Sequence, residues 1–250
     1  MGCLLNEAQR NFLMPESDSP LKEAVEIWFE PWMRVCFSAA AAQIDWTRGF
    51  IFLDKELQEL MRDSASGLRV VDKLAQVWLL SGKEEKIYLH LELQGWRERG
   101  FEERMYLYKI RLQERLGLNV ASFVILADHD PRWRPSFFEA ELLGDRIRFD
   151  FPSCKLLDLL DKLDGMGESI RPVAVVILAN WAAQETRHHL DERYKWKLKL
   201  ALDLYEEKLR PRIGTECIVW WIGCSICPSR RKSDLSTRSK ATRKRSVCHT

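Results

Sequence analysis

The chain has 250 residues, of which 46% are hydrophobic and 30% charged, and it contains ten Trp and eleven Phe; this composition suits one globular domain with a short appendage and excludes a wholly disordered, collagen-like or coiled-coil protein. No apolar run reaches the roughly 20 residues that cross a bilayer, and the first residues lack the basic and apolar regions of a secretory signal, so we expect a cytoplasmic protein that does not bind membranes. The net charge of +2 is the sum of two unlike segments, because residues 1–209 carry 29 bases and 35 acids whereas residues 210–250 carry ten bases and two acids.

The first third of the chain predicts a flexible lead-in followed by helices. Residues 1–20 are polar and read as the lead-in. Ser19 and Pro20 are typical of the N-cap and the first helical position, and Pro31 is expected to break or bend the helix that they open. A second helix is expected after Phe52, with Gly67 at its end.

Two strands that form an antiparallel hairpin are predicted next. Residues 68–80 are rich in Val and Leu and stop at the turn sequence Ser81-Gly82-Lys83. Residues 87–94 alternate between two faces. The apolar face holds Ile87, Leu89, Leu91 and Leu93, and the polar face holds Tyr88, His90, Glu92 and Gln94.

The remaining pattern predicts a mixed α/β domain. Helical spacing over 101–116 is followed by a short apolar run at 121–127, which is typical of a strand buried on both faces. Residues 137–143 and 146–151 indicate a second hairpin around Gly144-Asp145. Helices are expected over 154–163 and 182–209, and the run 172–180 fits either a strand or a buried helix. The sheet is therefore expected in the middle of the chain, within a domain spanning residues 21–210.

Residues 211–250 form a basic, cysteine-containing tail that we expect to be disordered, because its last part is almost free of apolar residues. One interpretation of the tail is a zinc site formed by Cys224 and Cys227 with Cys248 and His249, although the second pair lacks the usual spacing of a zinc finger. A basic arm for nucleic-acid phosphates is a second interpretation. We favour a third, a slipped reading frame, because amphipathic patterning stops abruptly after Arg210-Pro211.

Glu92 is the residue most suggestive of chemistry. A carboxylate in a central strand costs several kcal/mol to desolvate unless it is paired, neutralised or bound to a cation. Asp72, in the neighbouring strand, can converge with Glu92 at one end of the sheet, where two carboxylates and water suit Mg²⁺. Such a site activates water for phosphodiester hydrolysis. The alternative is that Glu92 faces solvent and Asp72 only caps a strand.

Several ordered motifs give a family resemblance. Asp72, a hairpin and then Glu92-Leu93-Gln94 resemble the PD-(D/E)XK nuclease signature, with Gln94 where many members have Lys. The sequences at 52–58 (FLDKELQ), 71–74 (VDKL), 90–94 (HLELQ), 133–135 (WRP) and 149–157 (FDFPSCKLL), with Phe101, Arg104, Met105 and Tyr108, resemble bacterial Rpn-like proteins, the recombination-promoting nucleases also labelled putative transposases. This likeness spans about residues 20–210.

The resemblance implies a restriction-endonuclease-like α/β core, a central mixed sheet flanked by helices, in a Mg²⁺-dependent DNA endonuclease, with Mn²⁺ as a substitute metal and DNA as partner. It implies that Asp72, Glu92 and the carbonyl of Leu93 bind the metal. Gln94 would orient water or substrate, although it lacks the charge of Lys.

The resemblance also assigns more peripheral roles. Glu56 would be an accessory catalytic acid, or else an exposed helical charge. Arg104 and Tyr108 would contact a phosphate, with packing as the alternative for Tyr108. His90 is expected to be structural.

Two further functions stay open: a non-catalytic DNA-binding or protein-interaction module on the same fold, and a zinc-stabilised binding protein. The sequence does not decide between a monomer and a homodimer.

Overall fold

The computed structural model describes residues 20–53, 73–81, 86–167, 169–186, 192 and 195–196. The chain divides into two compact units, Met1–Gln184 and Glu185–Thr250, and almost all the described residues belong to the first. The lead-in up to residue 19, the tail, and the helix expected after Phe52 from residue 54 onward lie outside the described residues. Within them, no helix is long and apolar enough to cross a membrane.

The helix predicted to begin at Pro20 is divided in two. α2 (Pro20–Ile27) and α3 (Phe29–Cys36) are separated at Trp28. The break was predicted at Pro31, but Pro31 instead lies in the first turn of α3, where a missing backbone N–H costs no helical hydrogen bond. A short helix, α4 (Ser38–Ala41), and a 3-10 turn, η2 (Trp46–Arg48), lead into the sheet.

In the described part of the chain, the main sheet has five strands in the order β1-β2-β3-β4-β7. Their bounds are β1 (Ile51–Phe52), β2 (Lys73–Trp78), β3 (Lys86–Gln94), β4 (Val120–Leu126) and β7 (Ser153–Lys155). β2 pairs antiparallel with β1 and β3, which confirms the predicted hairpin of β2 and β3. β3, β4 and β7 run parallel, so their carboxyl ends meet at one edge. We call this edge the carboxyl edge.

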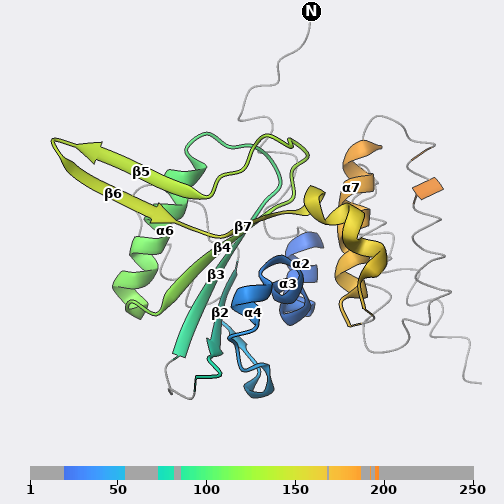
Figure 1. Ribbon diagram of the computed structural model, residues 1–250, viewed down its shortest axis with the longest axis horizontal. Helices are drawn as coiled ribbons and strands as arrows, with labels where there is room; N and C mark the ends of the chain where they lie inside the picture. Colours follow the sequence, from blue (N-terminus) through green and yellow to red (C-terminus); the bar gives the residue numbers. More distant parts are fainter. Residues whose placement is uncertain are drawn as a thin grey trace, which may run out of the picture. The chain divides into compact units, whose positions relative to one another are not determined.

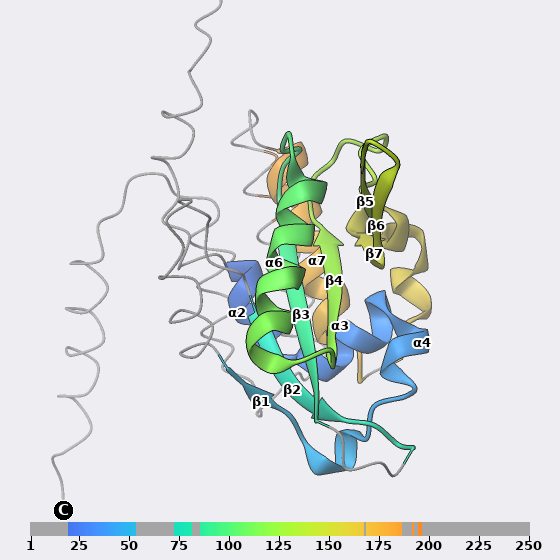
Figure 2. The ribbon, with the colours of Figure 1, turned by 90° about the vertical axis from the view of Figure 1, so that its left-hand side faces the viewer.

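Helices cover both faces of the sheet. α6 (Phe101–Leu116) lies on one face, and α2, α3 and α7 (Arg171–Glu185) lie on the other (Figures 1 and 2). The predicted bounds of α6 are confirmed, and its apolar stripe of Phe101, Met105, Tyr108 and Leu112 is fully buried. The ambiguous run at 172–180 is helical, within α7. The helix predicted over 182–209 is described at residues 182–186, of which 182–185 belong to α7, and at residues 192 and 195–196, which are helical.

One predicted helix is wrong at its start. Residues 154–163 were expected to be helical, but β7 occupies Ser153–Lys155 and a 3-10 helix, η3 (Leu156–Gly165), follows. Cys154 and Lys155 pair with Ile125 and Leu126 of β4. The local sequence pattern does not predict such a pairing, because the free energy that stabilises β7 comes from contacts with a strand far away in the sequence.

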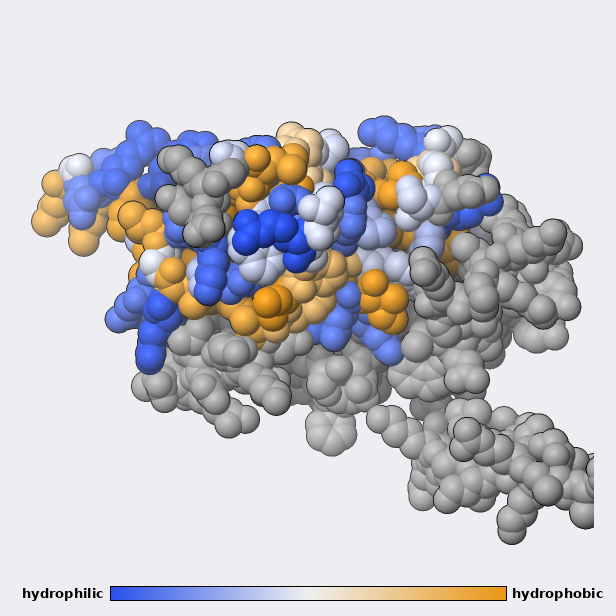
Figure 3. Space-filling model, turned by 90° about the horizontal axis from the view of Figure 1, so that it is seen from below, coloured by the Kyte–Doolittle hydropathy of each residue, from blue (hydrophilic) through white to orange (hydrophobic). Residues whose placement is uncertain are grey.

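The second predicted hairpin is confirmed and stands apart from the main sheet. Among the described strands, β5 (Phe137–Leu142) and β6 (Asp145–Asp150) pair only with each other, and the hairpin lies beside α6 (Figure 1). There Phe138 stacks on Tyr106 at 4.9 Å between ring centroids. Its two-residue turn is Leu143-Gly144, both with positive φ, as in a type I′ turn. Hydrophobic side chains are exposed at the free end of the hairpin, on the left of Figure 3.

Candidate active site

The polar side chains of β3 are buried beneath α6. His90, Glu92 and Gln94 are 0%, 2% and 3% exposed. The opposite face of the strand, with Leu89 and Leu91, is buried as well. A central strand covered by helices on both faces offers no solvent-facing row. The alternative in which Glu92 faces solvent is therefore wrong, and its carboxylate needs a cationic or hydrogen-bonding partner.

Arg104 provides that partner. It lies in the first turn of α6, and its Nη1 is 3.0 Å from Oε1 of Glu92. Burial alone would lower the pKa of Arg104, but the carboxylates of Glu92 and Glu98 and a hydrogen bond with Tyr108 raise that pKa above its usual value. The guanidinium therefore stays charged beside Glu92. It was predicted to contact phosphate, but only 8% of Arg104 is exposed, and its head group is already engaged within the protein.

Gln94 connects this pair to the following loop. Its Oε1 accepts a hydrogen bond from Nη2 of Arg104 at 2.9 Å, and its Nε2 donates to the carbonyl of Trp96 at 2.7 Å. The same Nε2 is 3.3 Å from Oε2 of Glu98, which also contacts Arg104 Nη2 at 3.3 Å. Gln94 thus acts as acceptor and donor at once, which an ammonium group cannot do. This double role gives a structural reason for Gln at the position where the resemblance expects Lys.

His90 and Tyr108 complete the interior of the site. Nδ1 of His90 is 3.1 Å from Oγ of Ser122 in β4, and Nε2 is 3.7 Å from Oε2 of Glu92. Among the described residues, His90 Nε2 has no hydrogen-bond partner. The ring of Tyr108 meets that of His90 edge-on, and Tyr108 is fully buried. The structure therefore places Tyr108 in the core, as the packing alternative for it expected, rather than on a surface that meets substrate.

Sequence reasoning missed a second buried ion pair at the carboxyl edge. Nζ of Lys155, at the end of β7, is 2.6 Å from Oδ1 of Asp128, which follows β4, and both side chains are buried. By register, Gln94, Leu126 and Lys155 stand side by side on neighbouring strands, so the Cα atoms of Gln94 and Lys155 are roughly 10 Å apart. The sequence signal was an acid directly after the buried run 121–127.

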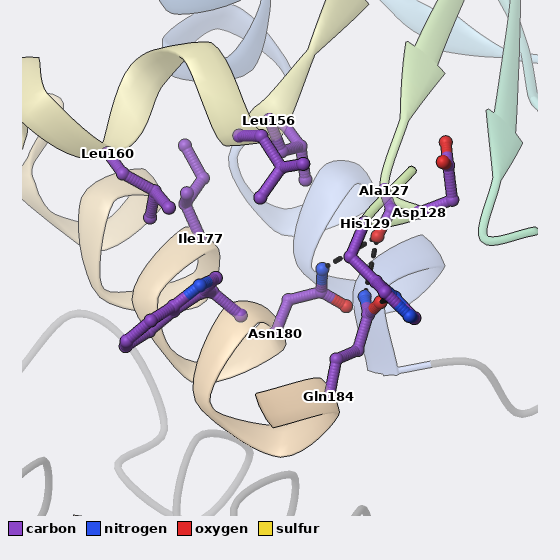
Figure 4. Close-up of a pocket in the computed structure, with 10 residues that line it drawn as sticks. Ala127, Asp128, His129, Leu156, Leu160, Ile177, Asn180 and Gln184 are labelled. Atoms are coloured by element: carbon purple, nitrogen blue, oxygen red, sulfur yellow. Dashed lines mark hydrogen bonds between the residues drawn. The ribbon is translucent and has the colours of Figure 1, made fainter. Parts of the chain in front are cut away.

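A small pocket lies on the other face, between η3, α7 and the end of β4 (Figure 4). Asn180 and Gln184 of α7 both donate to the carbonyl of Ala127, at 3.1 and 2.6 Å. The carboxylate of Asp128 points away from the pocket (Figure 4). The two hydrogen bonds tie α7 to the end of β4. The pocket volume of about 10 Å³ accommodates about one water molecule, so the pocket is too small for a nucleotide.

Among the described residues, Glu92 is the candidate metal ligand of the set predicted from the sequence that contributes a carboxylate. Asp72 and Glu56 lie outside them, so the predicted convergence of Asp72 and Glu92 is not described. Within the described part of the chain, no group of three or more His, Cys, Asp or Glu side chains is arranged to hold a metal ion. Glu92 nevertheless offers a desolvated carboxylate of the kind that Mg²⁺ prefers, and Nε2 of His90, which has no hydrogen-bond partner in the described part of the chain, is 3.7 Å from its Oε2. A carboxylate oxygen is a ligand type that suits a divalent cation, and such a cation would compete with Arg104 for Glu92.

Comparison with known proteins gives no further assignment, since no protein-family model, curated protein or solved structure matches this chain.

Proposed function

We propose that the chain is a metal-dependent DNA endonuclease of the Rpn-like, PD-(D/E)XK type. The observation that carries the proposal is the burial of Glu92 at the carboxyl edge, in contact with Arg104 and two residues before Gln94. Ligands in open α/β sheets bind outside the carboxyl ends of parallel strands. A charged acid is expensive to keep buried there for stability alone, which favours a functional reason for it.

The proposed roles of the site residues follow from their chemistry. Asp72, Glu92 and the carbonyl of Leu93 would hold Mg²⁺ or Mn²⁺, and the bound metal would lower the pKa of a water molecule and polarise the phosphodiester. Gln94 orients the guanidinium of Arg104 through its carbonyl oxygen. Arg104 neutralises the carboxylate of Glu92 while no metal is bound.

A second candidate function has support from a specific observation. The 3.0 Å contact between Arg104 and Glu92 satisfies the carboxylate without any metal, as expected of a non-catalytic DNA-binding or protein-interaction module on the same architecture. In that case the ion pair would be a structural element that locks α6 onto β3.

Nicking of supercoiled plasmid DNA separates the two functions. We expect wild-type protein to nick plasmid with Mg²⁺ or Mn²⁺, Glu92→Gln and Asp72→Asn to lose this activity, and EDTA to abolish it. Glu103→Gln is the matched control, because Glu103 is an exposed acid in the same first turn of α6. If the wild-type protein shows no cleavage with either metal, the enzymatic proposal is refuted and the non-catalytic module is favoured.

A further inference from the structure

The loop that joins β3 to α6, Gly95–Gly100, presents an aromatic side chain at the carboxyl edge. Trp96 is 54% exposed, whereas Trp28, Trp32 and Trp133 are buried. An indole is the largest apolar side chain, and its exposure costs hydrophobic free energy unless a ligand or partner covers it. Trp96 follows the proposed active-site strand by two residues.

The loop is held in place by the site itself. The carbonyl of Trp96 accepts the hydrogen bond from Gln94 at 2.7 Å, and Glu98 contacts Arg104 at 3.3 Å. These two contacts hold the segment 96–98 at both ends, so the backbone that carries the indole is coupled to the site. A surface that is already ordered loses little conformational entropy when it binds.

Exposed arginines lie in this loop and in the neighbouring loop after β4. The side chains of Arg97 and Arg132 are 69% and 89% exposed, and Arg99 is exposed as well. Asp130 lies between two of them, 3.7 Å from Nη1 of Arg97 and 3.5 Å from Nε of Arg132, and these contacts bring the loop after β4 against the loop after β3. Although residues 1–209 are acidic overall, this edge offers several guanidinium groups beside one exposed indole.

An exposed aromatic ring among cationic side chains is the arrangement by which proteins bind single-stranded nucleic acid, because bases stack on the ring and phosphates pair with the cations. In duplex DNA the faces of the bases are covered by their neighbours, so an indole finds a partner only where a base is unstacked. A protein contact also uses exposed Trp and Arg, but it gives no reason for the coupling between Trp96 and the proposed phosphodiester site.

We propose that Trp96 is a base-stacking platform, flanked by Arg97, Arg99 and Arg132, and that the chain recognises DNA with an unpaired base next to the site of Glu92. This inference deepens the proposed function and rests on it for the location of the scissile phosphate, but the binding it describes does not require cleavage.

The test compares a short single-stranded oligonucleotide with the same strand carrying abasic positions, by fluorescence anisotropy at fixed salt. The abasic strand keeps the phosphates and loses the stacking surfaces. We use the Glu92→Gln protein, so that cleavage does not interfere. We expect it to bind the intact strand about tenfold more tightly than the abasic one, and Trp96→Ala in the same background to bind both strands equally.

Two further variants make the result specific. Trp96→Phe keeps an aromatic ring and should retain most of the discrimination. Leu118→Ala is the matched control, because it removes an 83% exposed apolar side chain just before β4, at the opposite end of the sheet, and should bind like the parent.

The outcomes distinguish this inference from the proposed function. If Trp96→Ala binds the intact strand as tightly as the parent, or if the parent does not bind single strands at all, the inference is overturned and Trp96 is left as a protein contact. If the parent discriminates and the wild type never nicks plasmid, the stacking platform stands and the nuclease proposal fails.

Discussion

Replacing Arg104 with Met should destabilise the fold strongly. Arg104 and Glu92 are 8% and 2% exposed and 3.0 Å apart, and removing one partner of a buried ion pair costs roughly 3–5 kcal/mol, because the other charge is left uncompensated. In the described structure, the remaining cationic group near Glu92 is His90, at 3.7 Å and only when protonated. We therefore expect a loss of roughly 3–5 kcal/mol for Arg104→Met.

Removing the negative charge of the pair should lower the free energy of unfolding much less. Glu92→Gln keeps an oxygen at the Oε1 position to accept from Arg104, and Arg104 keeps Glu98 at 3.3 Å, so we expect a loss of about 1 kcal/mol. The double variant should be more stable than the sum of the two single effects implies, with a coupling free energy of roughly 1–3 kcal/mol.

Urea unfolding of the wild type, both single variants and the double variant measures this cycle. Arg104→Met should also lower the melting temperature by roughly 6–20 °C, at about 2–4 °C per kcal/mol for a domain of this size. An Arg104→Met protein within 1 kcal/mol of wild type, or strictly additive effects, would refute the argument that Arg104 holds a charged Glu92 in the core.

Three other predictions follow from single features. Gln94→Lys should destabilise by roughly 2–3 kcal/mol, since Lys cannot accept the hydrogen bond from Arg104; urea unfolding measures it against the exposed control Gln43→Lys, and equal stability would contradict the role assigned to Gln94. Leu143→Asn should stabilise the β5–β6 turn by about 0.5–1 kcal/mol, because Leu143 has φ of 52° and is fully exposed; slower amide exchange in the hairpin is expected, and unchanged exchange would count against strain there. Hydrogen bonds from Arg134 lower the pKa of Asp158, so the stability from this pair is complete above pH about 3.9 and is lost as the pH falls through the lowered value. Asp158→Asn should flatten the melting temperature against pH below pH about 4, and an unchanged acid limb would disprove the pairing.

The sequence predicts the parts of the fold that local patterning determines. α6 has a complete apolar stripe and a Gly stop, and its predicted and observed bounds agree. Strict alternation over 87–94 identifies β3, and the β2–β3 and β5–β6 hairpins follow from short connections. In each of these cases the information lies within about 20 residues of sequence.

The parts that fail depend on contacts between distant segments. β7 was assigned to a helix because Ser153–Lys155 shows no strand pattern of its own and forms only by pairing with β4. The buried pair of Asp128 and Lys155 is likewise not predictable from the local sequence, because the two residues are 27 positions apart in the chain.

The candidate site shows the same limit. Desolvation cost correctly indicated that a central carboxylate needs a partner. It did not say which one, and Arg104 comes from α6 across the sheet face rather than from a neighbouring strand. The docking of α6 on β3 therefore decides the electrostatics of Glu92, and no spacing rule in the sequence encodes that docking.

Metal binding by the purified protein tests the central claim most directly. If Glu92 is a metal ligand, isothermal titration with Mn²⁺ should show binding to the wild type and at least about tenfold weaker binding to Glu92→Gln, since a neutral amide is a much poorer ligand for a hard cation than a carboxylate. Arg104→Met should bind at least as tightly as wild type wherever it remains folded, because the competing cation is gone. A wild type that binds no Mn²⁺, or a Glu92→Gln protein that binds it equally well, would contradict the account.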